Sequence, residues 1–293
     1  MNVYDCFMYF DEDLLLDLRL NILNKYVDKF VITESKYLHS GKEKKLNFDV
    51  RNFSKFKDKI IYIPLEKLPE GIEEVKRDDN IEIKNKKILD NSLKRENNQR
   101  NQLIKGLVKA EDNDLILSSD LDEIPNLESF KYKNKIVLFE QKVFYYKFNL
   151  IQPNYNWIGT RACKKKELVS LQWLRNVKGK AYPFWRLDVF FSKKKYFNVE
   201  IIKNGGWHFT SIKKPKDIFY KLSNFMHHLE FEESGLKESD MERMVKDRRI
   251  LYDHSVKQEE EKYRGKQLLE KVNVSYLPEY IKNNLDKYKD WLD

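Results

Sequence analysis

The stretch DLILSSDLDEIPN, residues 114–126, joins an apolar run to a concentrated acidic end. The run LILSS predicts a buried strand, and three carboxylates follow it within four residues: Asp120, Asp122 and Glu123. Because side chains alternate along an extended chain, we expect Asp120 and Asp122 to point the same way. Ligands of parallel α/β sheets bind beyond the carboxyl ends of the strands. The stretch therefore predicts a ligand site at this strand end.

A hard cation is the ligand that this acidic end favours. Two close carboxylates repel each other unless a cation lies beside them, and oxygen ligands suit Mg²⁺ or Mn²⁺, which can bind a diphosphate in turn. His208 follows two glycines in NGGWHFTS and is a candidate third ligand, for which Mn²⁺ is the better ion. Two ordinary alternatives stay open: the acidic residues could cap a helix, and His208 could pack as an aromatic edge.

Strand-like and helix-like segments alternate over the first part of the chain. The expected strands are residues 2–10, 29–35 and 59–65, and the expected helices are residues 11–26, 48–58 and 90–114. This alternation predicts a parallel sheet with covering helices. The charged, poorly patterned segment 66–90 predicts a loop or a mobile flap.

The pattern changes after Pro125. Segments 135–151, 155–165 and 188–202 read as further strands, which we expect to be antiparallel, and helices resume near residues 216 and 241. The sequence predicts an α/β fold with a mixed or antiparallel second half and flanking helices. We expect one domain over residues 1–252 and a charged helical extension over residues 253–293.

Composition limits the class of protein. The chain has 293 residues, 14% of them aromatic, which predicts a folded globular protein. The net charge of +9 suits an anionic partner such as nucleic acid, a phosphorylated small molecule or a membrane surface. Cys6 and Cys163 form no CxxC motif, and no segment reaches the roughly 20 apolar residues of a membrane span. We expect a cytoplasmic protein, with peripheral association at the inner face of the membrane as an option.

Two further groups are candidates for chemistry. Arg95 and Arg100 lie on the helix that leads into the acidic strand, where they could face a phosphate or pair with neighbouring acids. Glu230, in SNFMHHLEF, could act as a general base or belong to a solvated helix face. The residues alone decide neither case.

Five segments resemble glycosyltransferase family 17 in their order along the chain. They are YDCFMYFDEDLLLDLRLNIL (4–23), VDKFVITES (27–35), RENNQRNQL (95–103), DLILSSDLDEIP (114–125) and GGWHFTS (205–211). The family contains the β-1,4-mannosyl-glycoprotein 4-β-N-acetylglucosaminyltransferases, and the resemblance extends over residues 3–250. It implies a GT-A-type, Rossmann-like fold, with residues 1–125 binding a UDP-sugar and residues 126–252 the acceptor. It also implies a divalent cation at the D-x-D motif and an inverting transfer.

The resemblance assigns site residues as well. Asp120 and Asp122 would hold the metal and the donor diphosphate or ribose. The other residues that it places at the donor are Glu123, Glu34, Trp207 and His208. Glu230 is the candidate acceptor base, with Asp188 and Glu200 as competitors. Arg19 is expected to be structural, buttressing its own helix.

The expected reaction moves N-acetylglucosamine from a UDP-sugar to a glycan or a lipid-linked saccharide. The lipid-linked acceptor is included because we expect a protein without the membrane anchor of the animal enzymes. Two other functions stay open: a metal-dependent nuclease or phosphotransferase, and a non-catalytic nucleic-acid-binding protein. A nucleic-acid partner is not expected, because lysines alternate with acids along the whole chain instead of forming one basic stripe.

Overall fold

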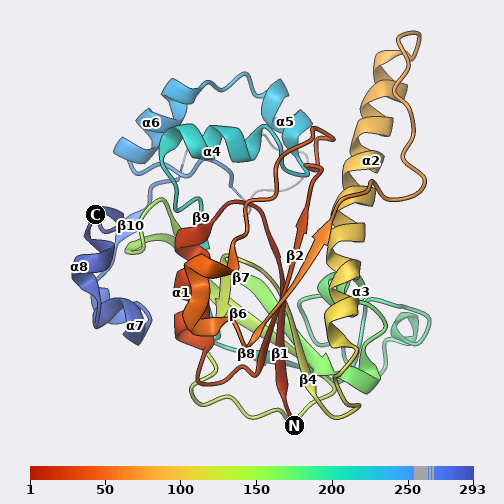
Figure 1. The fold of residues 1–293 in the computed structure, drawn as a ribbon, viewed down its shortest axis with the longest axis vertical. Coiled ribbons are helices and arrows are strands. Elements are labelled where there is room, and N and C mark those ends of the chain that lie inside the picture. Colours follow the sequence, from red (N-terminus) through yellow and green to blue (C-terminus); the bar gives the residue numbers. More distant parts are fainter. Residues whose placement is uncertain (254–262, 264, 266) are drawn as a thin grey trace.

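A computed structural model describes residues 1–253, 263, 265 and 267–293. Ten strands form one mixed sheet that curls strongly (Figure 1). They are β1 (Val3–Tyr9), β2 (Lys29–Ser35), β3 (Ile60–Leu65), β4 (Leu115–Asp120), β5 (Glu123–Pro125), β6 (Ile136–Tyr145), β7 (Leu150–Lys164), β8 (Val199–Ile202), β9 (Gly206–Thr210) and β10 (Glu270–Lys271). The path runs β3-β2-β1-β4-β7-β6-β9-β5, with β8 beside β6 and β10 beside β7.

The first half of the sheet is parallel, as the alternating pattern predicts. β1 lies between β2 and β4, β3 pairs with β2, and all three pairings are parallel. Helix α1 (Asp13–Leu23) connects β1 to β2, and α2 (Ile81–Gln102) precedes β4. The expected helix at residues 48–58 is a short 3₁₀ helix, Val50–Phe56.

The second half is mixed, in agreement with the expected mixed or antiparallel arrangement, although not all of its strands are antiparallel. β7 is antiparallel to both β4 and β6, but β8 and β9 run parallel to β6. The prediction of a long strand at residues 188–202 is wrong, because only Val199–Ile202 pairs with the sheet. Phe190 and Phe191 of this segment are both exposed in a loop instead of alternating between two faces.

The loop expected at residues 66–90 is also partly wrong, because α2 begins at Ile81. The Asn80 side chain accepts a hydrogen bond from Ile83 N (2.8 Å) and caps the helix. Lys87 pairs with Asp79 at 2.7 Å and ties the first turns to the preceding segment. These turns extend beyond the sheet, so they carry no apolar stripe for a sequence pattern to reveal (Figure 1).

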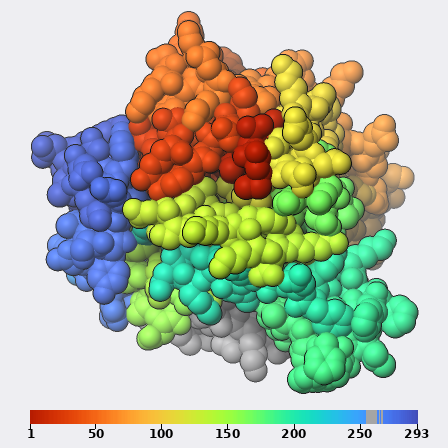
Figure 2. All heavy atoms as spheres, turned by 90° about the horizontal axis from the view of Figure 1, so that it is seen from below, coloured from red at the N-terminus to blue at the C-terminus, as the bar shows by residue number. Residues whose placement is uncertain are grey.

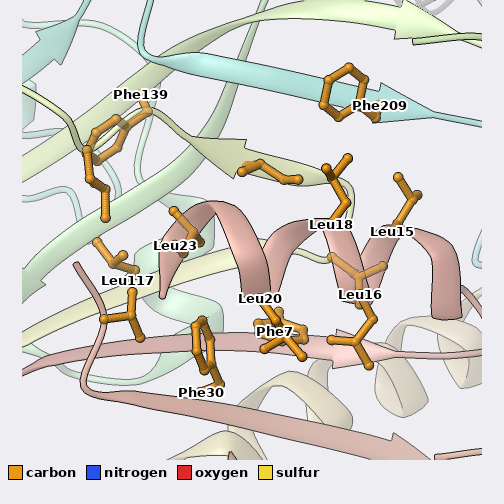
Figure 3. Close-up of a cluster of buried hydrophobic side chains, with 14 of the residues drawn as sticks. Phe7, Leu15, Leu16, Leu18, Leu20, Leu23, Phe30, Leu117, Phe139 and Phe209 are labelled. Carbon is orange, nitrogen blue, oxygen red and sulfur yellow. The ribbon is translucent and has the colours of Figure 1, made fainter. Parts of the chain in front are cut away.

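The main core lies around α1, whose side chains contact the sheet on more than one side (Figure 3). Its fully or almost fully buried leucines are Leu15, Leu16, Leu18, Leu20 and Leu23. They pack with Phe7 and Phe30 of the parallel strands and with Phe209 of β9. Because one helix fills the space between the two halves, the halves of the sheet share this core.

The remaining helices surround the sheet. They are α3 (Leu171–Asn176), α4 (Pro215–Leu222), α5 (His228–Glu233), α6 (Glu238–Lys246), α7 (Glu279–Lys282) and α8 (Leu285–Tyr288). Helices α4 to α6 form a second core with Tyr145 and Tyr146 at the end of β6. The described part of the expected C-terminal extension packs into the main core through Ile281 and Tyr288, both fully buried. No described helix is both long and apolar enough to cross a membrane.

Candidate active site

A buried arginine of α1 fixes the backbone of the acidic stretch. Arg19 Nη1 donates hydrogen bonds to the carbonyl oxygens of Asp120, Leu121 and Glu123, at 3.2, 3.2 and 2.7 Å. Its charge is paired with Asp5 of β1 at 2.6 Å, and both side chains are fully buried. Arg19 is therefore structural, as expected, but it holds the acidic turn and not only its own helix.

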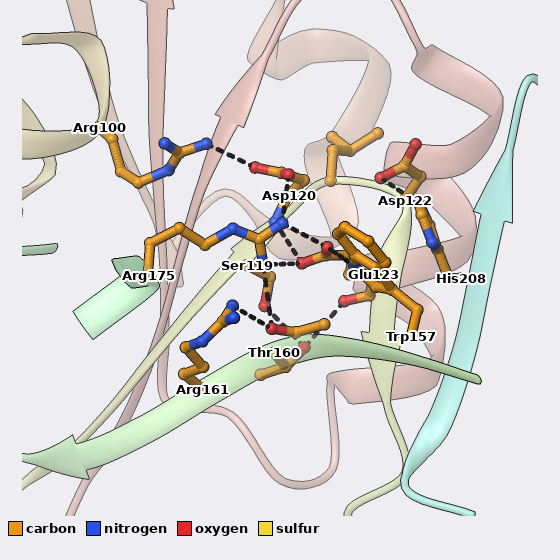
Figure 4. A network of polar contacts seen from close by, with 12 residues as sticks. Arg100, Ser119, Asp120, Asp122, Glu123, Trp157, Thr160, Arg161, Arg175 and His208 are labelled. Carbon is orange, nitrogen blue, oxygen red and sulfur yellow. Dashed lines mark hydrogen bonds and ion pairs between the residues drawn. The ribbon is translucent and has the colours of Figure 1, made fainter. Parts of the chain in front are cut away.

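The turn begins where β4 ends, at Asp120. Leu121 and Asp122 form the turn itself, and β5 starts at Glu123. The alternation of an extended strand therefore does not apply between Asp120 and Asp122, and the two carboxylates have different partners (Figure 4).

Two arginines hold Asp120. Its Oδ1 accepts from Arg100 Nη2 at 2.9 Å and its Oδ2 from Arg175 Nη2 at 2.7 Å (Figure 4). Burial alone would raise the pKa of Asp120, but the charges of Arg175 and Arg100 outweigh it and hold the pKa well below its usual range. Asp120 is ionised, with both carboxylate oxygens already used.

Glu123 is buried beneath the turn and is also fully engaged. Arg175 approaches its carboxylate with both terminal nitrogens, at 2.6 and 2.7 Å. Trp157 Nε1 donates to it at 2.6 Å and Asp120 N at 3.0 Å. Through these hydrogen bonds Glu123 links the turn to β7 and α3.

Asp122 has looser partners. His208 Nε2 lies 3.6 Å from its Oδ1 and Lys221 Nζ 3.7 Å from its Oδ2, both longer than a hydrogen bond. Burial would raise the pKa of Asp122, but His208 and then Lys221 outweigh it and lower the pKa. Burial would lower the pKa of His208, and Asp122 outweighs that effect and raises it. Lys221 also pairs with Glu12 at 3.0 Å.

A cavity of about 780 Å³ opens over this turn. Of the residues that the sequence singles out, it is lined by Asp120, Asp122, Glu123, Arg100 and His208. The structure thus brings together residues from α2, the β4–β5 turn and β9 in a space large enough for a nucleotide-sized ligand.

Two donor-site candidates have other surroundings. Glu34 is fully buried and accepts from Asn47 N (2.7 Å), Phe48 N (3.0 Å) and Tyr62 Oη (2.9 Å). Trp207 donates from Nε1 to Tyr276 O at 2.8 Å, because β9 turns it away from the neighbouring His208. Neither lines the cavity in the described part of the chain.

The other candidates lie outside the cavity lining too. Arg95 donates to His39 O at 3.0 Å. Asp188 pairs with Arg186 and Lys195 on an exposed loop, and Glu200 accepts from Asn134 at 3.0 Å. Glu230 faces His227 Nδ1 at 3.1 Å, and it is His227 that lines the cavity.

Sequence patterns did not reveal three cationic residues of the cavity, Arg175, Lys221 and Arg161. Arg161 is the most unusual, since no ion pair among the described residues includes it and its Nε is buried without a hydrogen-bond partner. Nη1 donates only to Gly159 O, at 3.0 Å. Burial, and then the nearby charge of Arg175, lower the pKa of Arg161 to about 9. A buried cation of this kind is a natural partner for an anionic ligand.

The donor set of this site fits a divalent cation only in part. Among the described residues no three His, Cys, Asp or Glu side chains are grouped closely enough to enclose a metal ion. Asp122 and His208 nevertheless lie at a separation that two ligands of one ion can have, since ligand atoms at about 2.1 Å from it are roughly 3 Å or more apart. Mg²⁺ is commonly held by one or two protein groups together with substrate phosphates and water.

The comparison with protein families fits this site. The sequence profile of glycosyltransferase family 17 matches residues 1–170, more than half of the chain. The chain belongs to glycosyltransferase family 17 and is a glycosyltransferase, acting on a sugar donor and an acceptor. The match includes the acidic turn but ends before Arg175, His208 and Lys221, so their place at the site rests on the structure. A comparison with curated proteins gives no match.

Proposed function

We propose that this glycosyltransferase moves N-acetylglucosamine from its UDP-sugar to a glycan or lipid-linked saccharide, with inversion and with a divalent cation. The observation that supports it most is the acidic β4–β5 turn, held by Arg19 at the floor of the cavity, in a chain of family 17. The two alternative functions, a nuclease or phosphotransferase and a nucleic-acid-binding protein, are set aside because of the family membership.

Asp122 and His208 are the residues that would hold the cation, Mn²⁺ or Mg²⁺. Asp122 is ionised, and neither of its oxygens has a partner at hydrogen-bond distance across the cavity. A bound divalent cation would neutralise charge on the departing UDP. Lys221, beside Asp122, adds a fixed positive charge on the same side. Both carboxylate oxygens of Asp120 accept hydrogen bonds from arginines. Asp120 would therefore position the turn, or it would accept a hydrogen bond from a ribose hydroxyl after one arginine moves away.

The acceptor base is proposed as a pair. Glu230 was the candidate, and its carboxylate meets His227 Nδ1 at 3.1 Å. With the proton on Nδ1, His227 offers Nε2 to the acceptor hydroxyl from a position in the cavity lining. Glu230 would then be a positioning residue that fixes the tautomer and orientation of the ring, and His227 the group that receives the proton.

Arg161 provides a test of the donor site that is separate from the metal. Arg161→Met should raise the Kd for UDP about tenfold to a hundredfold, since a charge-assisted hydrogen bond contributes about 1.5–3 kcal/mol. The Tm without ligand should stay the same or rise, because the variant removes a buried guanidinium that has no ion pair among the described residues. Calorimetric titration with UDP and a thermal melt measure the two quantities.

The control for this variant is Arg51→Met, which removes an exposed arginine paired with Asp49 and should change neither quantity. An Arg161→Met protein that binds UDP as tightly as the wild type would show that this arginine does not face the donor.

A thermal-shift titration tests the proposed function as a whole. The Tm should rise with Mn²⁺ plus UDP-N-acetylglucosamine by more than with either alone, because a ligand that binds only the folded state stabilises it by mass action. UDP-glucose and UDP-galactose, run in parallel, should give smaller shifts. If every UDP-sugar leaves the Tm unchanged with and without Mn²⁺, the proposed donor is wrong.

A further inference from the structure

An exposed aromatic loop lies beside the cavity. It covers residues 178–194, between α3 and β8, and we call it the aromatic loop. Five large apolar side chains within eight residues are exposed: Phe184 (80%), Trp185 (65%), Leu187 (71%), Phe190 (69%) and Phe191 (90%). No other eight-residue stretch of the described chain exposes more than two. In Figure 2 this green-to-teal part of the chain protrudes at the lower right, far from the C-terminal segment in blue.

The loop is a built structure with defined anchors. Its ends are joined by a hydrogen bond from Lys178 N to Lys194 O at 2.8 Å. Trp173 of α3 donates to Lys193 O at 2.9 Å, and Tyr182 and Val189 are buried beneath the loop. Because these contacts hold the loop in place, its exposed aromatic side chains are directed toward solvent and are not part of an incompletely packed core.

The charge around the aromatic side chains is positive. Residues 178–195 contain six cations and a single acid: Lys178, Lys180, Arg186, Lys193, Lys194, Lys195 and Asp188. Asp188 is neutralised by Arg186 and Lys195, each at 2.6 Å. Aromatic side chains rimmed by lysines match a bilayer with anionic headgroups, where the rings enter the interface and the lysines meet the phosphates.

We propose that the aromatic loop docks the protein onto an anionic lipid bilayer. A second copy of the chain would be a poorer partner, because pairing this loop with itself would bring two clusters of lysines together. Lys194 of the loop and Asn176 at the end of α3 also line the cavity, so docking places the cavity mouth beside the membrane surface. Together with the proposed function, this position favours the lipid-linked saccharide as the acceptor.

Vesicle co-sedimentation of the full chain tests the docking. Wild-type protein should sediment with phosphatidylcholine vesicles that contain phosphatidylglycerol, and much less with phosphatidylcholine alone. The variant F184S/W185S/F190S/F191S should bind the anionic vesicles at least about tenfold more weakly, with an unchanged Tm because all four side chains are exposed. The variant K178Q/K180Q/K193Q should lose the preference for phosphatidylglycerol.

The matched control is V108S/V169S, which removes two isolated exposed apolar side chains, and it should bind as the wild type does. The proposal is overturned if the wild type stays in the supernatant with anionic vesicles, or if the aromatic variant sediments equally well. It is also overturned if size exclusion shows a wild-type dimer that the aromatic variant turns into a monomer.

Failure of docking and failure of the proposed function can be told apart. The thermal shift with Mn²⁺ and UDP-N-acetylglucosamine needs no vesicles, and the aromatic variant should retain it. If the wild type binds vesicles but shows no such shift, the docking proposal stands and the proposed donor is wrong.

Discussion

Asp122→Asn should lower the turnover number at least about a hundredfold while the protein remains folded. The substitution keeps the shape of the side chain and removes the negative charge that lies between His208 and Lys221. If this carboxylate holds a divalent cation, the variant loses a contribution of several kcal/mol to the transition state, and each 1.4 kcal/mol is a factor of ten in rate. Fold retention is expected because Lys221 still has Glu12 as a partner. The assay is transfer from UDP-N-acetylglucosamine with and without Mn²⁺, followed by a thermal melt.

The matched control is Asp112→Asn, at the opposite end of β4, where the aspartate is exposed. It should change the turnover number by less than about twofold, as expected of a surface substitution away from the site. An Asp122→Asn protein that keeps a Mn²⁺-dependent Tm shift would place the cation elsewhere. One that keeps wild-type turnover would remove Asp122 from the mechanism.

Local sequence patterns predicted the parts of the site that depend on a single element. The apolar run LILSS followed by carboxylates identified the end of β4 correctly. His208, singled out because it follows two glycines, lies on β9 and lines the same cavity. The alternation that was expected to bring Asp120 and Asp122 together does not apply, because the extended backbone stops at Asp120, although both residues line the cavity. A turn of two residues then sends the carboxylates to different partners.

Arg175 and Lys221, unlike Arg100, depend on the tertiary fold and left no local signal. Arg175 reaches Glu123 across 52 positions of sequence, and Lys221 reaches Glu12 from another element of the chain. In sequence both look like ordinary charges of short helices. Most of the positive charge beside the acidic turn is therefore supplied by arginine and lysine side chains of the protein itself. The proposed divalent cation would add to it at Asp122.

Arg19→Met should destabilise the protein by about 3–5 kcal/mol, the largest effect on stability that we expect from one substitution. It leaves the carboxylate of Asp5 fully buried without its partner and deprives the carbonyls of Asp120, Leu121 and Glu123 of a donor. The free energy of unfolding is measured by urea denaturation. Arg243→Met, which breaks an exposed pair with Asp240, is the control and should remain within about 0.5 kcal/mol of the wild type.

A double-mutant cycle with Asp5→Leu separates the ion pair from the turn. Removing both partners should destabilise less than the sum of the single changes, because no uncompensated charge is then buried. The loss of unfolding free energy that remains in the double mutant measures the hydrogen bonds from Arg19 to the three carbonyls. Because these bonds hold the turn that carries Asp122, only their loss should be accompanied by weaker binding of UDP. If Arg19→Met does not fold, Arg19→Lys retains the charge with fewer donors and reports the same loss of turn geometry. A cycle in which the two effects simply add, with UDP binding intact, would mean that Arg19 stabilises the core but does not position the acidic turn.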